Sequence, residues 1–159
     1  MFMISLLASL FFGFTATANA GDFRDLNFGQ APSEDMVKIK PGIIQRHTGT
    51  DDYTRPSDDL QFGSGKAFTI RYGFWRDKLF IVSIHFQGDS NYRGILEAAT
   101  AKFGQPHKVG TWDYEWRNLE KYDLEIYYAG SSKRKRGSLR LSSKDISEQI
   151  RASKGTVGR

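Results

Sequence analysis

Cysteine is absent from all 159 residues of the sequence. The protein can therefore form no disulfide bond and no thiolate metal site, and it cannot carry a lipid anchor attached through cysteine. A phosphate-binding glycine loop and a nucleophile motif of the G-x-S-x-G type are also missing, because the 16 glycines are dispersed along the chain. These absences remove the most recognisable classes of nucleotide-binding protein and serine hydrolase.

Ionisable side chains are missing from residues 1–21, and residues 4–14 are nearly continuously apolar. This run is shorter than the length that spans ~30 Å of hydrocarbon, and Ala18 and Ala20 form an A-x-A cleavage site. We therefore expect residues 1–20 to be a signal peptide cleaved before Gly21, with a cut two residues earlier as the second possibility. Because no Lys or Arg precedes the apolar run, an uncleaved anchor stays an alternative. Export without cysteine indicates a periplasmic or secreted bacterial protein.

Positive charge is concentrated at the C-terminal end of the chain. Residues 131–159 hold nine Lys or Arg against two acids, whereas residues 21–130 hold fourteen against sixteen. We expect a single domain over residues 21–142, followed by a basic helix or tail over 143–159. No other segment is apolar enough to cross a membrane, so the mature chain is expected to have no transmembrane span.

Two alternating runs, at 68–74 and 80–86, predict an antiparallel hairpin with one strongly aromatic face. From Tyr92 the apolar period becomes that of a helix, which Ser90 would cap and Gly104 would end. The remaining elements are shorter: a helix near 33–37, a long loop over 41–66 with at most two short strands around 53 and 60–62, and strands over 112–116, 124–128 and 139–141.

This order predicts an α+β fold, with an antiparallel sheet of about five strands and helices packed on one face as a two-layer sandwich. The helix after the hairpin should cover its aromatic face, burying Phe80, Val82 and Phe86. The long loop is a candidate functional element, because such loops are uncommon inside compact domains.

No set of catalytic residues stands out. The three histidines lie in different predicted elements, and none accompanies a nucleophile motif. The acids of the long loop match no calcium-loop spacing, so no metal or other cofactor is expected. The enzymatic alternative is a hydrolase with a site in the 41–66 loop, around His47, Asp51 and Asp52.

Two groups of surface residues are candidate sites for an anion or a partner. The first is a hairpin tip whose consecutive cations could contact anionic lipid or glycan: Lys133, Arg134, Lys135 and Arg136. The second combines rings that could stack on a partner with nearby arginines: Trp75, Trp116, Arg71 and Arg117. Nucleic acid is not expected as a partner, because the predicted helix should cover the aromatic face of the hairpin.

Three stretches, FRDLNFGQAPSEDM, YGFWRDKLFIVSIHF and NYRGILEAATAKFGQP, resemble those of small uncharacterised proteins exported by proteobacteria. The order of short helices before hairpins also resembles the SmpA/OmlA outer-membrane assembly family and the β-lactamase inhibitory protein fold. The resemblance implies an α+β interaction domain. Members of the assembly family carry a lipidated cysteine, which this chain lacks, so no functional residue is carried over.

The sequence therefore predicts an exported binding domain without catalysis, whose partner is another envelope protein or an anionic envelope surface. Two alternatives stay open. One is a binder of anionic lipid or glycan through the basic hairpin tip, and the other is the hydrolase with a site in the 41–66 loop.

Overall fold

The computed structural model describes residues 21–40, 49–130 and 135–155. The predicted signal peptide, part of the long loop and part of the basic tip lie outside these residues. The described elements follow in the order β1 (Val37–Lys38), β2 (Thr50–Thr54), β3 (Gln61–Phe62), β4 (Gly65–Trp75), β5 (Lys78–Gln87), α2 (Asp89–Phe103), β6 (His107–Lys108), β7 (Tyr114–Trp116), β8 (Tyr122–Ala129), β9 (Arg136–Ser143) and α3 (Lys144–Gly155).

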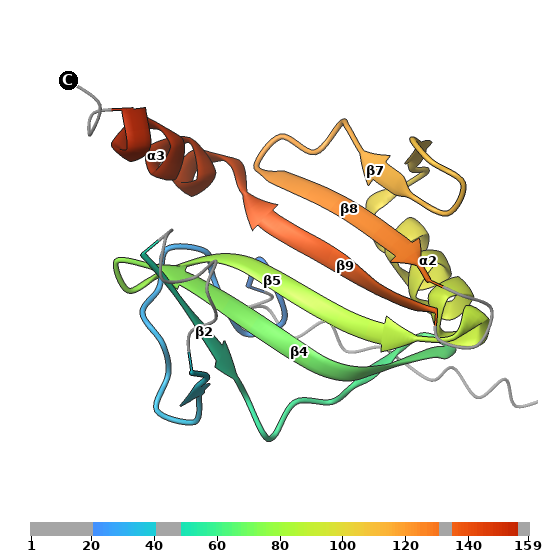
Figure 1. Ribbon diagram of the computed structural model, residues 1–159, viewed down its shortest axis with the longest axis horizontal. Coiled ribbons are helices and arrows are strands. Elements are labelled where there is room, and N and C mark those ends of the chain that lie inside the picture. The colour runs from blue at the N-terminus through green and yellow to red at the C-terminus, as the bar shows by residue number, and fades with distance from the viewer. Residues whose placement is uncertain (1–20, 41–48, 131–134, 156–159) are drawn as a thin grey trace, which may run out of the picture.

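All the strands belong to one antiparallel sheet, in the order β1-β2-β4-β5-β9-β8-β7-β6, with β3 beside β4 (Figure 1). The mixed helix and strand class and the antiparallel sheet are as predicted, but the described residues form nine strands of the sheet where about five were expected. The excess comes from β2 and β3, which were expected only as optional short strands of the long loop, and from the two-residue strands β1 and β6, which were not expected. Strands this short show no period in the sequence.

The predicted long helix is α2, and it forms one layer of the fold. Tyr92, Ile95 and Ala99 face the core from it, and its backbone ends at Gly104, which has a φ of 86°. A positive φ suits glycine because it has no Cβ atom to clash with the backbone. Beneath this layer, Val82 and Phe86 are fully inaccessible to solvent.

Two irregularities in the central hairpin correct the prediction that its rings share one face. The β4–β5 register shifts between Ala67 and Thr69, and again between Gly73 and Phe74. The first shift turns Phe68 outward, where it is 53% exposed and contacts the ring of His85. The second shift opposes Leu79 to Phe74 and removes Phe80 from the main core. A β-bulge reverses alternation in this way because it adds one residue to one strand of a pair.

The helix expected near residues 33–37 does not form. Ser33 instead accepts a backbone hydrogen bond from Met36 in a turn, and β1 follows directly. Ser33 is equally suited to a turn, since serine hydroxyls favour turns as well as helix starts.

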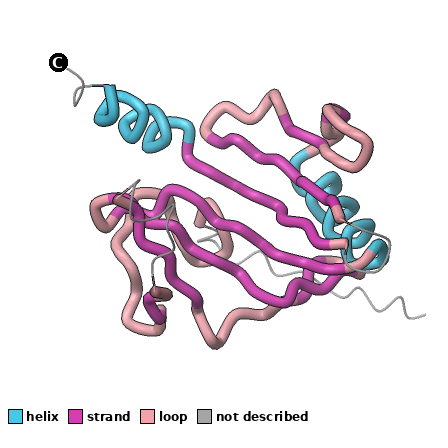
Figure 2. Tube along the Cα trace, viewed as in Figure 1, coloured by secondary structure: helices cyan, strands magenta, loops and turns pink. Residues whose placement is uncertain are grey.

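The C-terminal helix α3 does not join the layer formed by α2. Its Ile146 and Ile150 form a separate cluster with Trp75, and Phe80 packs against that cluster. Figure 2 shows α3 beyond the end of β9, at the opposite end of the molecule from α2. A helix packs against the sheet as predicted, and that helix is α2. The helix α3, expected as a basic helix or tail after the domain, has its own apolar contact with Trp75 and Phe80.

Candidate functional site

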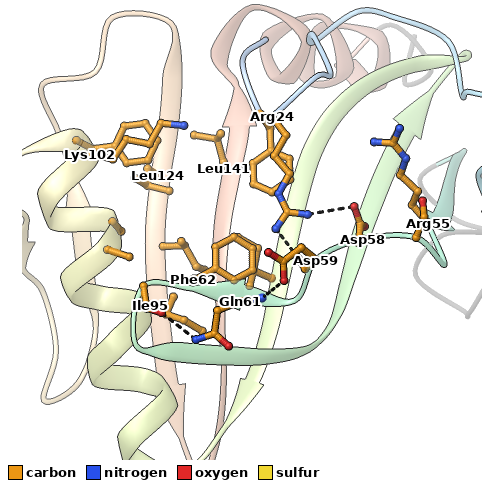
Figure 3. A pocket seen from close by; sticks show the side chains of 18 residues that line it. Arg24, Arg55, Asp58, Asp59, Gln61, Phe62, Ile95, Lys102, Leu124 and Leu141 are labelled. Atoms are coloured by element: carbon orange, nitrogen blue, oxygen red, sulfur yellow. Dashed lines mark hydrogen bonds and ion pairs between the residues drawn. The ribbon is translucent and has the colours of Figure 1, made fainter. Parts of the chain in front are cut away.

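A pocket of about 630 Å³ lies between α2, the inner face of the sheet, the N-terminal segment and the β3 region (Figure 3). Its floor comes from three neighbouring strands. Ile84 of β5 is in register with Leu139 of β9, and Leu124 of β8 is in register with Leu141 of β9. The volume falls within the range of about 300–1,000 Å³ that is usual for small-molecule pockets.

The floor is deep, because each of its four side chains belongs to a residue no more than 6% exposed. One wall is the inner face of α2, where Ala98 and Ala99 take the place of larger side chains. Alanine leaves space that a leucine would fill, so the sequence of α2 itself keeps the pocket open. The aromatic rings of Phe23, Phe62 and Phe103 stand around the floor.

Opposite α2, the pocket is bordered by the N-terminal segment and by the chain that precedes β3, and Arg24 connects the two. Its guanidinium lies 5.3 Å from the ring centre of Phe23 and 5.0 Å from that of Phe62, at cation–π distance. Nη1 donates to Oδ1 of Asp58 at 3.2 Å, and Nη2 donates to the carbonyl oxygen of Asp59. The side chain therefore connects the N-terminal segment to the chain that precedes β3.

Asp58 accepts a second hydrogen bond, of 2.7 Å, from the hydroxyl of Tyr72 on β4. Burial first, and the bond to Asp58 second, raise the pKa of Tyr72 well above its ordinary value. Its phenol thus stays protonated and keeps donating to Asp58 at all ordinary pH values. The Asp58 side chain is 6% exposed and is fully engaged by Arg24 and Tyr72.

Arg55, at the edge of the pocket, makes a second connection to the N-terminal segment. It donates to Oδ1 and Oδ2 of Asp25 at 2.8 and 2.9 Å and also to Asp35. The hydrogen bond from Arg55 lowers the pKa of Asp25. For Asp35, the bond from Ser33 is the largest cause of a lowered pKa and the bond from Arg55 is the second.

Lys102, in the last turn of α2, is the remaining cation of the pocket lining. Its Nζ lies 5.2 Å from the ring centre of Phe103. Within the described part of the chain, no carboxylate or carbonyl oxygen bonds to this ammonium group. Asp59, by contrast, accepts a 2.9 Å hydrogen bond from the backbone N–H of Gln61.

The basic hairpin tip is only partly described. Lys133 and Arg134 lie outside the described residues. Lys135 bonds to Asp89 at 3.1 Å, and its Nζ lies 5.4 Å from the ring of Trp112, so the fold itself uses this cation. Arg136 begins β9 and is exposed.

The predicted group of tryptophans and arginines is not brought together. Trp75 is 8% exposed beneath α3, and Trp116 is 4% exposed and donates from Nε1 to the carbonyl of Gly104 at 2.7 Å. Both rings are buried, Trp75 against the apolar side chains of α3 and Trp116 with its hydrogen bond to Gly104, which corrects the expectation that they are surface rings. Arg71 is exposed on β4, and Arg117 donates to Glu115 at the opposite side of the sheet.

The loop alternative is also only partly described, since His47 lies outside the described residues. Asp51 accepts a 2.7 Å hydrogen bond from Lys38, and Asp52 follows it on β2, so their side chains leave opposite faces of the strand. The described residues contain no group of three or more His, Asp or Glu side chains placed to hold a metal ion.

The pocket itself was not predicted, although one part of the prediction points to it. The 41–66 loop was a candidate functional element, and its described part contributes seven lining residues, from Arg55 to Gly63. The two short strands expected there are β2 and β3. A further sign of the pocket in the sequence is the pair Ala98 and Ala99 on α2, followed by Lys102.

Among the described residues, no helix has the length and apolar character needed to cross a membrane. No known protein family, curated protein or solved structure matches this chain.

Proposed function

We propose that the protein is a binding protein without catalytic activity, and that the pocket beside α2 holds an apolar ligand or an apolar part of one. The observation that carries the proposal is the pocket of about 630 Å³ with an aliphatic floor. Apolar pockets of this size with a few polar groups at the edge are the usual form of small-molecule sites.

The contacts of the polar side chains support binding over catalysis. Arg24 and Asp58 bond to each other, Arg55 bonds to two aspartates outside the pocket, and the side chain of Gln61 bonds to the carbonyls of Gly63 and Gly65. These groups fix the walls in place. General acid–base catalysis instead needs a titratable group within reach of the reacting atom.

The proposal keeps the predicted location. An exported protein of the bacterial envelope meets apolar and amphiphilic molecules at membrane surfaces, which suits a pocket of this chemistry. The resemblance to exported interaction domains also agrees with a binding role, and it stays a prediction.

Filling the pocket tests the proposal. Ala98 lines the pocket and Ala101 is exposed on the same helix outside the lining, so Ala98→Phe and Ala101→Phe form a matched pair. We expect the full chain to bind the neutral fluorescent probe N-phenyl-1-naphthylamine saturably. Ala98→Phe should weaken this binding at least about tenfold, because the new ring occupies the space of the probe.

The control is Ala101→Phe, which should bind the probe as the unchanged chain does. Circular dichroism of both variants would show that each is folded. Equal probe binding by the two variants, or no saturable binding by the unchanged chain, would contradict the proposal.

A further inference from the structure

The chemistry of the pocket limits the kind of ligand that it can hold. The deep part is lined by aliphatic side chains of the sheet and of α2: Ile84, Ile95, Ala98, Ala99, Leu124, Leu139 and Leu141. The charged lining side chains lie outside this aliphatic set, and the buried one among them, Asp58, is already bonded to Arg24 and Tyr72. A sugar or nucleotide would leave its hydroxyl and base groups without hydrogen-bond partners against this floor, and unpaired buried polar groups are unfavourable.

An aliphatic chain has no such groups, so it matches the floor along its whole length. Figure 3 shows Leu124 and Leu141 between Lys102 on α2 and Arg24 on the N-terminal segment. The leucine floor of the pocket thus has a cation on either side.

The two cations differ in what they already bind. The guanidinium of Arg24 is occupied by Asp58 and by the carbonyl of Asp59. The carboxylate of Asp58 is in turn occupied by Arg24 and Tyr72. Arg55 is shared between Asp25 and Asp35. Lys102 is left as the charged lining side chain whose ionised group bonds to no other described residue.

This inference rests on the proposed function and deepens it. We infer that the ligand is a single-chain anionic amphiphile of the fatty-acid type, with its alkyl chain on the floor of the pocket and its carboxylate beside Lys102. The ammonium group can donate to a carboxylate as a point charge, and its apolar stem can follow the pocket wall.

A structural role for Lys102 is the competing explanation. A lysine in the last turn of a helix interacts favourably with the helix dipole, and α2 ends one residue later. That role would affect the stability of α2 but would not make the protein distinguish ligands by their charge.

The experiment compares three probes with the same chain and different ends: dodecanoate, dodecanol and dodecylammonium. Their affinities for the full chain are measured by competition with the fluorescent probe, below the concentrations at which they form micelles. We expect dodecanoate to bind about fivefold more tightly than dodecanol, as for a partly exposed ion pair, and dodecylammonium to bind most weakly.

The variant Lys102→Gln should reduce dodecanoate binding to the level of dodecanol and should leave dodecanol binding unchanged. The matched control is Arg93→Gln, which removes an exposed cation from the same helix outside the pocket lining. This control should retain the preference for dodecanoate. Raising the salt concentration should reduce the preference in the unchanged chain, because salt screens exposed charges.

The outcomes separate the inference from the proposed function. If the three probes bind equally, or Lys102→Gln lowers dodecanol binding as much as dodecanoate binding, the inference is overturned and the apolar pocket stands. If dodecylammonium binds most tightly, the inference is overturned as well, because the selecting charge would be an acid. If none of the three competes with the fluorescent probe, the pocket is not an aliphatic-chain site and the inference fails. A failure of the proposed function would already be seen as the absence of saturable probe binding.

Discussion

Arg24 has a backbone φ of 56°, in the left-handed region that residues other than glycine, asparagine and aspartate rarely adopt. Such a conformation costs on the order of 1 kcal/mol and persists only where surrounding contacts hold it. Here the surrounding contacts are the rings of Phe23 and Phe62 and the bonds to Asp58 and Asp59. The strained residue is thus the one that closes the pocket opposite α2.

The two central strands permit a direct test of side-chain orientation at single residues. Strict alternation would place Phe68 on the same face as Ile70, whereas the bulge turns it outward, and Phe86 stays fully buried. Phe86→Ala should lower the free energy of unfolding by about 3–5 kcal/mol, because it leaves a core cavity. Phe68→Ala should cost about 1 kcal/mol or less, because about half of that residue already meets solvent.

Urea unfolding followed by circular dichroism measures both changes. Equal losses in the two variants would mean that Phe68 is buried and that the hairpin has no bulge there. The example shows why sequence alone could not place Phe68. Alternation is a property of one strand, but a bulge is a property of the pairing of two strands.

At the scale of elements, α2 and the chain around β3 approach each other through two glycines. A Cβ atom added at Gly94 would lie 2.2 Å from the backbone nitrogen of Gly65. Neither backbone can move away without disturbing its own element, because Gly65 begins β4 and Gly94 lies inside α2. This contact fixes the distance between the helix and the β3 side of the pocket.

Gly94→Ala should therefore destabilise the protein, although alanine is favoured over glycine by about 1 kcal/mol in an ordinary helix. The clash should outweigh that gain and lower the free energy of unfolding by about 1–3 kcal/mol, as overpacking usually does. Thermal unfolding measures the change. Ala101→Gly is the control on the exposed side of α2, and it should show the ordinary helix preference. A higher midpoint for Gly94→Ala would contradict the close approach.

The elements with a long period were predictable, and the short strands were predictable only in part. The helix α2, the two halves of the central hairpin, β8 and β9 were all expected from their apolar patterns. The two-residue strands β1 and β6 carry no pattern and were missed, and Ser33 fits a turn as well as a helix start. The pocket could not be derived either, because its floor depends on the order of β5, β9 and β8 in the sheet, which no local sequence determines.

At the scale of the whole molecule, polar links attach the N-terminal segment where a cysteine-rich protein would use disulfides. Arg24 bonds to Asp58, and Arg55 bonds to Asp25 and Asp35. A third link joins the carboxylate of Asp22 to the hydroxyl of Tyr122 on β8. These links attach the N-terminal segment both to the chain that precedes β3 and to β8. The segment therefore covers part of the core as well as one side of the pocket.

The hydroxyl groups of Tyr92, Tyr122 and Tyr128 each donate a hydrogen bond within the fold, so the stability of the molecule is sensitive to alkaline pH. Burial is the largest cause that raises the pKa of Tyr92 and of Tyr128 to about 12, and the bond to Asp22 is the largest cause for Tyr122, also to about 12. The ordinary value is 10.0. Tyr92 and Tyr128 stack on each other with ring centres 4.5 Å apart, so two of the three groups lie in one aromatic cluster.

Because these pKa values are higher in the folded protein than in the unfolded chain, the stabilisation is complete below pH 10 and is lost as the pH rises to about 12. A shift of this size corresponds to up to about 3 kcal/mol for a buried tyrosine. The midpoint of urea unfolding should therefore stay nearly constant from pH 7 to pH 9.5 and fall steeply above pH 10.

The variant Tyr128→Phe lacks one of the ionising hydroxyls and its bond to Asp89. It should therefore be less stable than the unchanged chain at pH 8, but it should lose less stability between pH 10 and pH 12. Equal losses for the two proteins over that interval would mean that Tyr128 ionises in the folded state as readily as in the unfolded one, and that the cluster around it is open to water.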